Sequence, residues 1–496
     1  MAKKKINKEL TGAQDLYNFL FEACNIIRGP VSQDNFKDYI TPLLYYKRIS
    51  DVYDEETKEA LISSGGDKEY ASLPEQHRFV IPDGCHWQEV RERTENFGAA
   101  IVGAMRQIEI ANPDTLYGVL SMFSSQKWTN KAILNDSKIR DLIEHLSKRK
   151  LGNKDYPADL MGDAYEILLK KFADDSKAQA GEFYTPRSVV RLLVHILDPQ
   201  PGETVYDPAC GSGGMLIEAI RYMHDDSLCC GSIFGQEKNV VNAAIAKMNL
   251  FLHGASDFNV MQGDTLRDPK ILQGGNIAKF DCVIANPPFS LENWGATEWS
   301  SDKYKRNIYG TPSDSCGDYA WIQHMICSMA SGQGRMAVVM PQGILFRNQE
   351  TEIRKQLVES DLIEAVVTLG DKLFYGTGLS PCFLIIRRMK PAHHSGRILM
   401  IDGSKILTQK RAQNILEEND IDRLYSLYQN YSDEEDYSRI VTLQEIRDKE
   451  YNLSPNRYVV YHKEEIRPYA EVLAEFKHAY EEVKRLEEEF SLLINA

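Results

Sequence analysis

The chain has 496 residues, with 58 Lys and Arg against 72 Asp and Glu and a formal net charge of −14; this length predicts roughly two to four domains. Hydrophobic residues make up 43% of the chain and charged residues 26%, which are ordinary globular values and exclude wholesale disorder. The acidic balance counts against a polyanionic partner unless basic side chains gather in one place.

The N-terminal residues and the cysteines indicate the cellular compartment in which the chain functions. No apolar run of roughly eighteen residues occurs, and polar Asn7, Lys8 and Glu9 follow the lysines at 3–5 where a signal peptide would be apolar. None of the nine cysteines forms a CxxC pair. We therefore expect a soluble, cytoplasmic protein in a reducing compartment, without membrane contact and without a metal site.

Residues 1–150 are predicted to form a helical domain. Apolar positions recur at three- and four-residue spacing in 15–21 and 39–52, and no strand-like alternation of similar length competes with them. The charged residues at 148–150 and then Gly152 interrupt this pattern, so a domain boundary is predicted near residue 150.

Residues 151–400 alternate short apolar strands with helical stretches. Helices are predicted at 215–223, 240–252 and 319–329. Strands are predicted at 204–206, 232–236, 259–262, 280–285, 336–340, 365–369 and 383–386. The alternation predicts an α/β fold with a doubly wound, mainly parallel sheet that helices cover on both faces. Ligands of such folds bind where the carboxyl ends of strands open into loops.

Residues 401–496 are predicted to be an acidic helical region, since they hold 13 Lys and Arg against 21 Asp and Glu, a net charge of −8. Beyond Pro455, apolar side chains recur every three or four residues, as in a coiled-coil-like helix. This stripe comprises Ile466, Tyr469, Leu473, Phe476, Tyr480, Val483, Leu486, Phe490 and Leu493. Such a helix either packs on its own domain or binds a partner.

A glycine-rich turn follows the first predicted strand of the sheet. Asp207 comes directly after the strand, and Gly211, Ser212, Gly213 and Gly214 lead into a helix. Glycines let a ligand approach the backbone closely, and the start of the helix offers free N–H groups. Turns of this kind bind nucleotides, dinucleotides or S-adenosylmethionine, and many are simply tight turns.

Two acidic side chains follow the next two strands. Glu237 lies roughly 20-odd residues after the glycines, where doubly wound folds hold a ribose through its hydroxyls. Asp264 closes the third strand and could accept from an adenine amino group or merely cap the following turn. The chain lacks GxxxxGK[ST], HExxH and GxSxG, which removes the commonest phosphate-cleaving, zinc-protease and serine-hydrolase interpretations.

The motif that closes the fourth strand points to a specific chemistry. Asn286, Pro287, Pro288 and Phe289 follow the apolar stretch 280–285. Two prolines suffice to stop a strand, but they do not explain why an amide precedes them and an aromatic ring follows. Methylation of an exocyclic base amine explains all four positions.

That methylation is difficult because the nitrogen lone pair is delocalised into the ring of the base. The Asn286 side-chain oxygen and the Pro287 carbonyl could accept the amine hydrogens and stabilise the cation that develops. Proline fixes φ and presents its carbonyl rigidly, while Phe289 could stack on a base rotated out of a duplex. No covalent nucleophile is needed, and Cys382 is expected in the core of a late strand.

These motifs resemble those of the amino-methyltransferases of DNA, in which 207–213 would be the cofactor motif and 286–289 the catalytic motif. The segment 181–187 is similar to one in the methylation subunit of type I restriction–modification systems, and 39–51 and 451–458 also resemble that subunit. The resemblance spans nearly the whole chain. It implies a Rossmann-like methyltransferase domain at 151–400 between a DNA- or partner-contacting N-terminal domain and a partner-binding C-terminal region.

The resemblance further implies S-adenosylmethionine as the cofactor and adenine N6 in DNA as the methyl acceptor. The residues implied to bind the cofactor are Glu182, Phe183, Tyr184, Thr185, Pro186, Arg187, Asp207, Gly211, Ser212, Gly213, Gly214, Glu237 and Asp264. The implied catalytic residues are Asn286, Pro287, Pro288 and Phe289. Pro186 is also suited to the first position of a helix.

The partners implied by the resemblance are double-stranded DNA, a specificity subunit that chooses the sequence, and a restriction subunit that joins to cut. Two methylation subunits would bind each specificity subunit. The acidic region 401–496 is hardly a DNA-reading module, which agrees with a separate specificity chain. Two alternatives stay open: the same chemistry on cytosine N4, RNA or a protein amide, and a non-catalytic scaffold that retains the fold.

Phosphate binding needs a local basic face rather than a basic total charge. The candidate residues are Lys127, Lys131, Lys138, Arg140, Lys148, Arg149 and Lys150 near the predicted boundary, and Lys303, Lys305 and Arg306 after the catalytic motif. Each cluster could equally be solvated surface. We expect the isolated chain to hold DNA weakly until it assembles.

Overall fold

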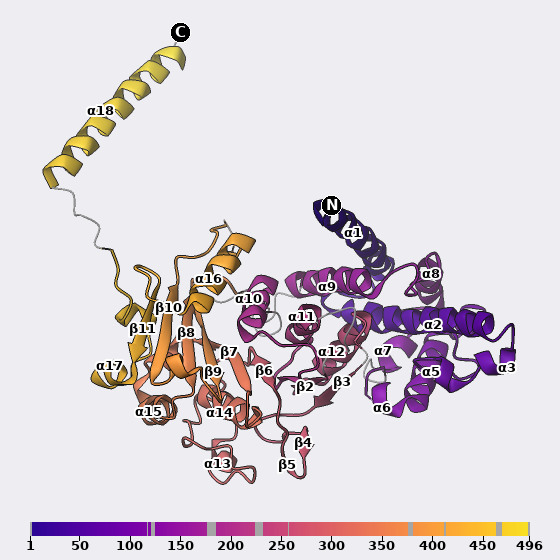
Figure 1. Cartoon of the computed structure of the whole chain (residues 1–496). Helices are drawn as coiled ribbons and strands as arrows, with labels where there is room; N and C mark the ends of the chain where they lie inside the picture. The colour runs from indigo at the N-terminus through magenta and orange to yellow at the C-terminus, as the bar shows by residue number, and fades with distance from the viewer. Residues whose placement is uncertain are drawn as a thin grey trace.

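The computed structural model describes residues 2–116, 118–120, 125–175, 185–223, 232–255, 257–374, 380–410, 413–462 and 469–494. Figure 1 shows a helical N-terminal part, a central sheet with helices on both faces, and a long C-terminal helix. None of the described helices combines the length and the apolarity that crossing a membrane requires.

The described N-terminal residues form helices, which confirms the helical prediction for 1–150. The helices are α1 (Ala2–Ile27), α2 (Lys37–Ser63), α3 (Lys68–Ala71), α4 (Trp87–Arg91), α5 (Phe97–Ala111), α6 (Pro113–Leu116), α7 (Ser125–Thr129), α8 (Asp136–Ser147) and α9 (Ala158–Asp175). Local sequence sets their ends: the Asn135 side chain accepts from the Lys138 N–H and starts α8.

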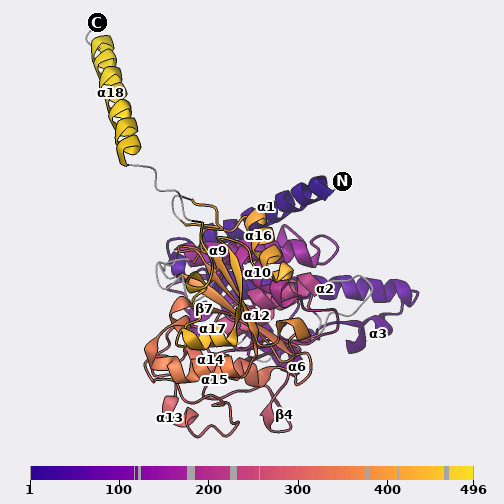
Figure 2. The ribbon, with the colours of Figure 1, turned by 60° about the vertical axis from the view of Figure 1, so that its left-hand side comes forward.

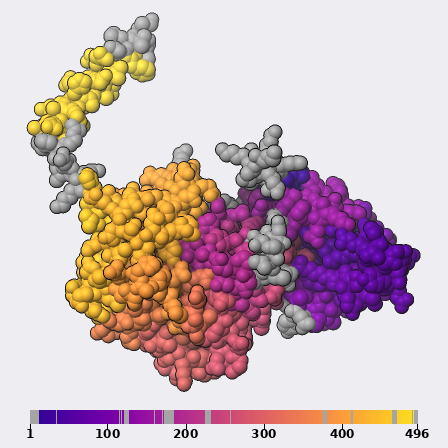
Figure 3. All heavy atoms as spheres, viewed as in Figure 1, coloured from indigo at the N-terminus to yellow at the C-terminus, as the bar shows by residue number. Residues whose placement is uncertain are grey.

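The N-terminal helices share one hydrophobic core, and α12 (Val240–Leu252) from the central part enters it. Leu20 of α1 and Leu43 of α2 are fully buried in this core. The Phe251 ring of α12 meets the Tyr45 ring of α2 edge-on, with 5.1 Å between the ring centroids. Figure 3 shows the two parts in direct contact, and α12 contributes residues to the core of the N-terminal helices.

The central sheet has nine strands in the order β11-β10-β8-β9-β7-β6-β1-β2-β3. They are β1 (Val205–Asp207), β2 (Ile233–Glu237), β3 (Phe258–Gln262), β6 (Cys282–Ala285), β7 (Arg335–Pro341), β8 (Ile363–Leu369), β9 (Pro381–Arg387), β10 (Arg397–Gly403) and β11 (Ser438–Thr442). Neighbours run parallel except where β9 pairs with β7 and β8 and where β11 pairs with β10. The prediction of a mainly parallel sheet is confirmed.

Alternate strand residues face two separate cores, as the pleat of a strand requires. Ile284 of β6 belongs to the core beneath α10, α11 and α16, whereas Val283 and Ala285 belong to the core beneath α14, α15 and α17. Figures 1 and 2 show these two sets of helices on opposite faces of the sheet. The predicted helical cover on both faces is therefore present.

The remaining elements are shorter or lie near the C-terminus. The helices are α10 (Arg187–Leu197), α11 (Gly214–Met223), α13 (Ala296–Trp299), α14 (Asp318–Ser328), α15 (Thr351–Glu359), α16 (Glu418–Asn430), α17 (Leu443–Asp448) and α18 (Tyr469–Ile494). Short 3₁₀ turns lie at Gln33–Asn35, Pro74–Gln76, Gln342–Leu345, Asn348–Glu350, Ala392–His394 and Pro455–Arg457, and β4 (Leu272–Gln273) pairs with β5 (Asn276–Ile277) as a small hairpin.

All seven predicted strands and all three predicted helices are present, with ends shifted by a few residues. Two strands of the sheet were not predicted. β10 crosses the predicted boundary at residue 400, and β11 is a short, partly polar strand at the sheet edge, where one face and one side escape full burial. The sheet therefore extends past residue 400, and the region predicted to be helical also supplies an edge strand.

Candidate active site

The carboxyl ends of four parallel strands meet at one edge of the sheet. β1 lies between β2 and β6, with Asp207 in register with Gly235 and Tyr206 in register with Val283. β3 continues the edge beyond β2. The residues that follow these strands therefore gather in one region, where doubly wound folds bind their ligands.

The turn after β1 has the backbone conformation that its glycines suit. Gly211 and Gly213 have φ of +53° and +83°, values that residues with a Cβ rarely adopt. The Ser212 carbonyl accepts a hydrogen bond from the Asn249 side chain at 3.0 Å, and α11 begins at Gly214. The start of α11 thus opens toward the carboxyl edge of the sheet.

Glu237, the last residue of β2, is bonded to this turn. Its Oε2 accepts the Gly211 N–H at 3.0 Å, and its Oε1 accepts the Asn239 N–H at 2.7 Å. Burial raises the pKa of the Glu237 carboxyl above its ordinary value. The acidic residue and the glycine turn that the sequence singles out are therefore in direct contact.

Asp207 is a second buried carboxyl at this edge, only 2% exposed. Its Oδ1 accepts the Ala209 N–H at 2.9 Å. Burial, reinforced by nearby Glu237, raises the pKa of Asp207 to about 8. Within the part of the chain that the structure describes, no basic side chain forms an ion pair with either carboxyl. A pair of buried carboxyls of this kind favours a ligand that carries positive charge.

Asn286 lies at the carboxyl end of β6, and its side chain is held in one orientation. Its Nδ2 donates to Thr185 Oγ1 at 2.8 Å, a contact between residues 101 positions apart. The Asn286 Oδ1 is buried and has no hydrogen-bond partner among the described residues. Buried acceptors are normally satisfied, so this oxygen is suited to a donor on a ligand. Pro287 is buried directly behind it, whereas Pro288 is exposed.

The loop after the catalytic motif is anchored by a carboxylate that sequence reasoning missed. The Ser290 N–H, directly after Phe289, donates to Asp318 Oδ1 at 2.7 Å. Asp318 is fully buried and also binds the Arg347 guanidinium. The signal that could have found it is an acidic residue immediately before the helix predicted to begin at 319.

Asp264 caps the turn that follows β3. Its Oδ1 accepts the N–H groups of Leu266 and Arg267, both at 3.2 Å, and its Oδ2 lies 2.9 Å from the Lys238 ammonium. These contacts match the capping interpretation of Asp264. Its contact with an adenine amino group stays a prediction.

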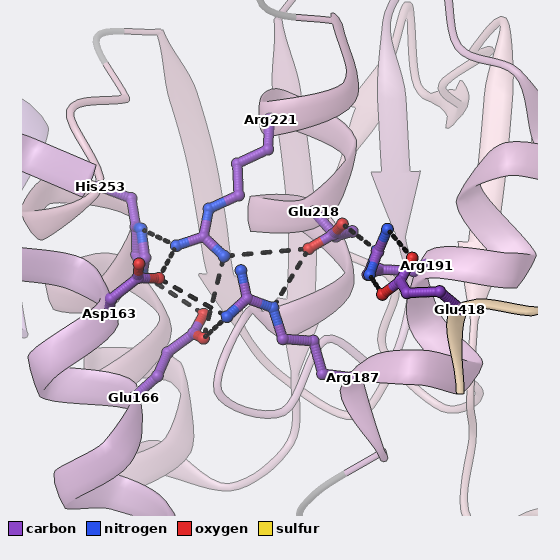
Figure 4. Close-up of polar contacts among 8 residues, drawn as sticks. All are labelled: Asp163, Glu166, Arg187, Arg191, Glu218, Arg221, His253 and Glu418. Atoms are coloured by element: carbon purple, nitrogen blue, oxygen red, sulfur yellow. Dashed lines mark hydrogen bonds and ion pairs between the residues drawn. The ribbon is translucent and has the colours of Figure 1, made fainter. Parts of the chain in front are cut away.

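Arg187 lies in a charged cluster at the start of α10, as Figure 4 shows. Its guanidinium lies 3.6 Å from Asp163, 3.7 Å from Glu166 and 3.8 Å from Glu218. Arg221 of α11 binds Asp163 at 2.6 Å in the same cluster. These contacts join α9, α10 and α11, so Arg187 has a packing role whether or not it also reaches the cofactor.

The segment before α10 is described only in part. Glu182, Phe183 and Tyr184 lie outside the described residues. Pro186 is the N-terminal cap of α10, one position before the first helical position predicted for it. Thr185 contacts Asn286, as described above, so the described end of this segment lies beside the catalytic motif.

Several predicted DNA-contacting residues have partners inside the chain. Arg306 is 1% exposed and binds Asp302, so its prediction as a phosphate contact is wrong. The charges of three others are paired on the surface: Lys127 binds Asp38, Lys131 binds Asp136 and Arg149 binds Asp15. Sequence counting cannot anticipate such pairing, because the partners are brought together by folding.

Residues 156–466 match the N-6 DNA methylase family, and residues 16–146 match the HsdM N-terminal domain. The chain belongs to the N-6 DNA methylase family. S-adenosylmethionine is accordingly its cofactor, and adenine N6 in DNA is the position that it methylates. The two buried carboxyls of Asp207 and Glu237 fit this cofactor, which carries sulfonium and ammonium charges and ribose hydroxyls.

Named relatives of this N-6 DNA methylase are subunits of restriction enzymes. It is 35% identical over 471 residues to the type I restriction enzyme MjaVII methylase subunit of Methanocaldococcus jannaschii, covering 90% of this chain and 78% of that protein. It is 31% identical over 360 residues to the type I restriction enzyme HindI methylase subunit of Haemophilus influenzae, covering 70% and 76%.

A solved structure has the same fold. The crystal structure of the type I restriction–modification system methyltransferase subunit from Streptococcus thermophilus matches with a TM-score of 0.75 at 25% identity. The match covers 91% of this chain and 100% of that chain. It therefore includes both the N-terminal helices and the sheet.

Cofactor affinity is expected to depend on the ionisation of Asp207. With a pKa of about 8, this carboxyl is mostly protonated at pH 7 in the folded chain, and a cationic ligand must displace its proton. The cofactor amine also titrates near pH 8, so the quantity to measure is the ratio of wild-type to Asp207→Asn affinities. Calorimetric titration is expected to show this ratio rising about tenfold between pH 7 and pH 9.

The direction of this pH dependence follows from the raised pKa of Asp207. Because folding raises the pKa of Asp207, ionising the carboxyl opposes folding as the pH rises toward 8, and a bound cation removes that cost. The isosteric Asp207→Asn variant can still accept from the Ala209 N–H, so the pocket geometry is kept. An affinity ratio that stays constant across this pH range would contradict the role of Asp207.

Proposed function

We propose that this chain is the methylation subunit of a type I restriction–modification enzyme, which transfers a methyl group from S-adenosylmethionine to N6 of an adenine rotated out of DNA. The observation that carries the proposal is the Asn286 side chain. Thr185 fixes its Nδ2, while its buried Oδ1 has no partner among the described residues. An exocyclic amine of the target base supplies the missing donor.

Asn286 acts on the target amine together with the backbone that follows it. Its Oδ1 and the Pro287 carbonyl accept the two amine hydrogens, which directs the nitrogen lone pair toward the methyl group and stabilises the developing positive charge. Pro287 and Pro288 restrict the backbone, and Phe289 stacks on the displaced base. These four residues form the proposed catalytic set.

S-adenosylmethionine, when bound, supplies an electrophilic methyl group on its sulfonium. The glycine turn at 211–214 packs around its methionine part, and Glu237 accepts from the ribose hydroxyls. Asp207 contributes negative charge once the cationic cofactor has displaced its proton, and Asp264 is proposed to lie toward the adenine. The segment 182–187 is proposed to line the cofactor site, and Thr185 is proposed to orient Asn286 through its hydrogen bond to that side chain.

We propose that the sequence of the DNA target is chosen by a separate specificity subunit. The relatives are named as methylase subunits of type I restriction enzymes. A restriction subunit is proposed as a further partner of this chain. Residues 401–496 carry a net charge of −8, which disfavours a DNA-reading role for this region. Two methylation subunits per specificity subunit are proposed to clamp the DNA.

The C-terminal helix α18 is the proposed site of assembly. Figures 1 and 2 both show it separated from the rest of the described chain. Its large apolar side chains are between 46% and 66% exposed; they are Val472, Phe476, Tyr480, Val483, Leu486 and Phe490. An apolar stripe of this kind on one helix requires a partner helix to bury it. Residues 1–150 are proposed to contact DNA or partners, and 151–400 to perform methyl transfer.

Reconstitution tests this function. The chain is purified alone and with a specificity chain encoded beside it, and transfer of labelled methyl groups to DNA is measured. The complex is expected to produce N6-methyladenine at one sequence, whereas the isolated chain binds S-adenosylmethionine but methylates little. Strong sequence-specific methylation by the isolated chain would contradict the separate specificity subunit, and N4-methylcytosine in the digested product would contradict the acceptor.

A further inference from the structure

A polar cleft of about 490 Å³ lies between two loops beside the catalytic motif. One loop follows β7 and contributes Phe346 and Asn348; the other contributes Lys449, Asn452 and Arg457. The Leu453 N–H donates to the Leu345 carbonyl at 2.9 Å and joins the two loops. The second loop, 449–457, overlaps the segment 451–458, which the methyl-transfer scheme leaves without a role.

The position of the cleft relates it to the target base. β7 runs parallel to β6, so the loop after β7 emerges at the same carboxyl edge as Asn286. Asp318 connects the loop after β6 with the loop after β7, since it accepts the Ser290 N–H at 2.7 Å and binds the Arg347 guanidinium. Ser290 directly follows the catalytic motif, and Arg347 lies between Phe346 and Asn348 of the cleft. The cleft and the catalytic loop are therefore neighbours held by one buried carboxylate.

The lining of the cleft is basic in a chain that is acidic overall. It contains Arg354, Lys449 and Arg457 against the single carboxylate of Glu450, and the other polar side chains are neutral amides and hydroxyls. Arg354 is buried and uses its guanidinium within the protein, donating to the Tyr451 carbonyl at 2.8 Å and to the Arg347 carbonyl at 2.9 Å. The charges available to a ligand are therefore those of Lys449 and Arg457.

Arg457 is exposed, and its guanidinium makes no hydrogen bond or ion pair with any residue that the structure describes. The Lys449 ammonium donates to the Arg457 carbonyl and lies 4.2 Å from the centre of the Tyr458 ring, but it pairs with no described carboxylate. This differs from Lys127, Lys131, Arg149 and the buried Arg306, whose charges are matched by acidic side chains. An anion in the cleft would find two cations without an ion-pair partner among the described residues, together with several amide donors and the single carboxylate of Glu450.

An exposed aromatic ring accompanies these charges. Phe346 is 49% exposed at the cleft, next to Asn348. Cationic grooves that also present aromatic rings suit nucleic acid strands, whose phosphates bind the cations while a sugar or base packs on the ring. A small free anion would have no use for the ring, so the combination favours a nucleic acid strand.

The backbone of the second loop is held in place despite local strain. Glu450 and Tyr451 have φ of +55° and +58°, two successive residues with side chains in the left-handed region. The Tyr451 N–H donates to the Ile446 carbonyl and the Tyr451 hydroxyl to Glu359, both at 2.9 Å. The amide and guanidinium groups of the loop are therefore presented from a fixed support.

We infer that this cleft binds the phosphodiester backbone of the DNA strand that carries the target adenine, with Arg457 and Lys449 on the phosphate and Phe346 against the neighbouring nucleoside. The inference rests on the proposed function and deepens it, since it assigns a backbone contact beside the catalytic loop. Holding the strand on this side keeps the displaced adenine in reach of Asn286. The contact carries no sequence information, which stays with the specificity subunit.

The test uses the full complex with its specificity subunit and a duplex that the wild-type complex methylates. Arg457→Gln removes the charge of a side chain without internal partners, so folding is expected to be unaffected. The KM for DNA is expected to rise about tenfold near 0.15 M salt, and the slope of log KM against log salt is expected to fall by about one phosphate contact. The kcat at saturating DNA and the affinity for S-adenosylmethionine are expected to stay at wild-type values.

Lys355→Gln is the matched control. Lys355 is exposed on α15 near the cleft but does not line it. An Arg457→Gln complex with the KM and salt slope of Lys355→Gln overturns the assignment. Failure of Arg457→Gln to assemble with the specificity subunit also overturns it, because the cleft would then be a protein interface. Absence of methylation by the wild-type complex contradicts the proposed function itself and is thereby distinguished from both results.

Discussion

Replacing Asn286 by alanine is expected to lower the rate of methyl transfer to adenine by at least about 10²–10³-fold, the cost of removing one preorganised polar group from a reaction centre. The Asn286 Oδ1 is a buried acceptor without a described partner, and its loss removes the group proposed to receive an amine hydrogen. Cofactor affinity is expected to change little, because Asp207 and Glu237 are untouched. The measurements are labelled methyl transfer by the reconstituted complex and calorimetric titration of the cofactor.

Two further variants test whether the loss of activity comes from the missing acceptor at residue 286. Asn286→Asp keeps an acceptor oxygen, and the Thr185 hydroxyl can turn to donate to the new carboxylate, so intermediate activity is expected. Asn276→Ala makes the same chemical change in the exposed hairpin of β4 and β5 and is expected to leave activity unchanged. A wild-type rate of methyl transfer by the Asn286→Ala complex would contradict the catalytic role of Asn286.

Replacing Phe476 by aspartate is expected to separate this chain from its specificity subunit. Phe476 is 66% exposed on the apolar stripe of α18, and its ring stacks beside that of Tyr480 with 6.3 Å between centroids. Losing the burial of an aromatic side chain costs about 1.5–3 kcal/mol, and placing a charge in an apolar interface adds to it. Affinity between the two chains is therefore expected to fall by about 10²-fold or more.

The readout is co-purification of the two chains, followed by methylation and cofactor titration. His478→Asp is the control, because residue 478 lies two positions further along the helix and so faces the opposite side. It is expected to assemble normally. Normal assembly of Phe476→Asp would instead show that the stripe of α18 does not contact the specificity subunit.

Local sequence signals account for most of the sheet. The strands β6 to β9 are mostly apolar runs, whereas β2 and β3 mix apolar residues with Asn, Gln and Glu. The turns that follow β1 and β6 contain the glycines and prolines that end a strand. β11 lacks this signal, since its short sequence mixes Ser, Arg and Thr with Ile and Val. Its place at the sheet edge is decided by pairing with β10, which sequence pattern does not encode.

Some contacts of the candidate site could likewise be predicted from the sequence, and others could not. The contact of Glu237 with Gly211 could be anticipated, because doubly wound folds place the second strand end beside the glycine turn. The contact of Thr185 with Asn286 could not, since it joins two loops far apart in the chain. Asp318 and the charged cluster around Arg187 were missed for the same reason. The partners of Asp318 lie in two separate loops and those of Arg187 in two other helices, which only packing brings together.

The position of α12 in two cores has a consequence for how this chain tolerates change. Ile245 and Phe251 of this helix belong to the core of the N-terminal helices, whereas Ala246 and Leu250 belong to the core under the sheet. The boundary near residue 150 is therefore a change of sequence pattern and not a division of the hydrophobic interior. Substitutions in the N-terminal helices and in α12 are therefore energetically coupled. A chimera that takes its N-terminal helices from a relative would also need the helix of that relative that corresponds to α12.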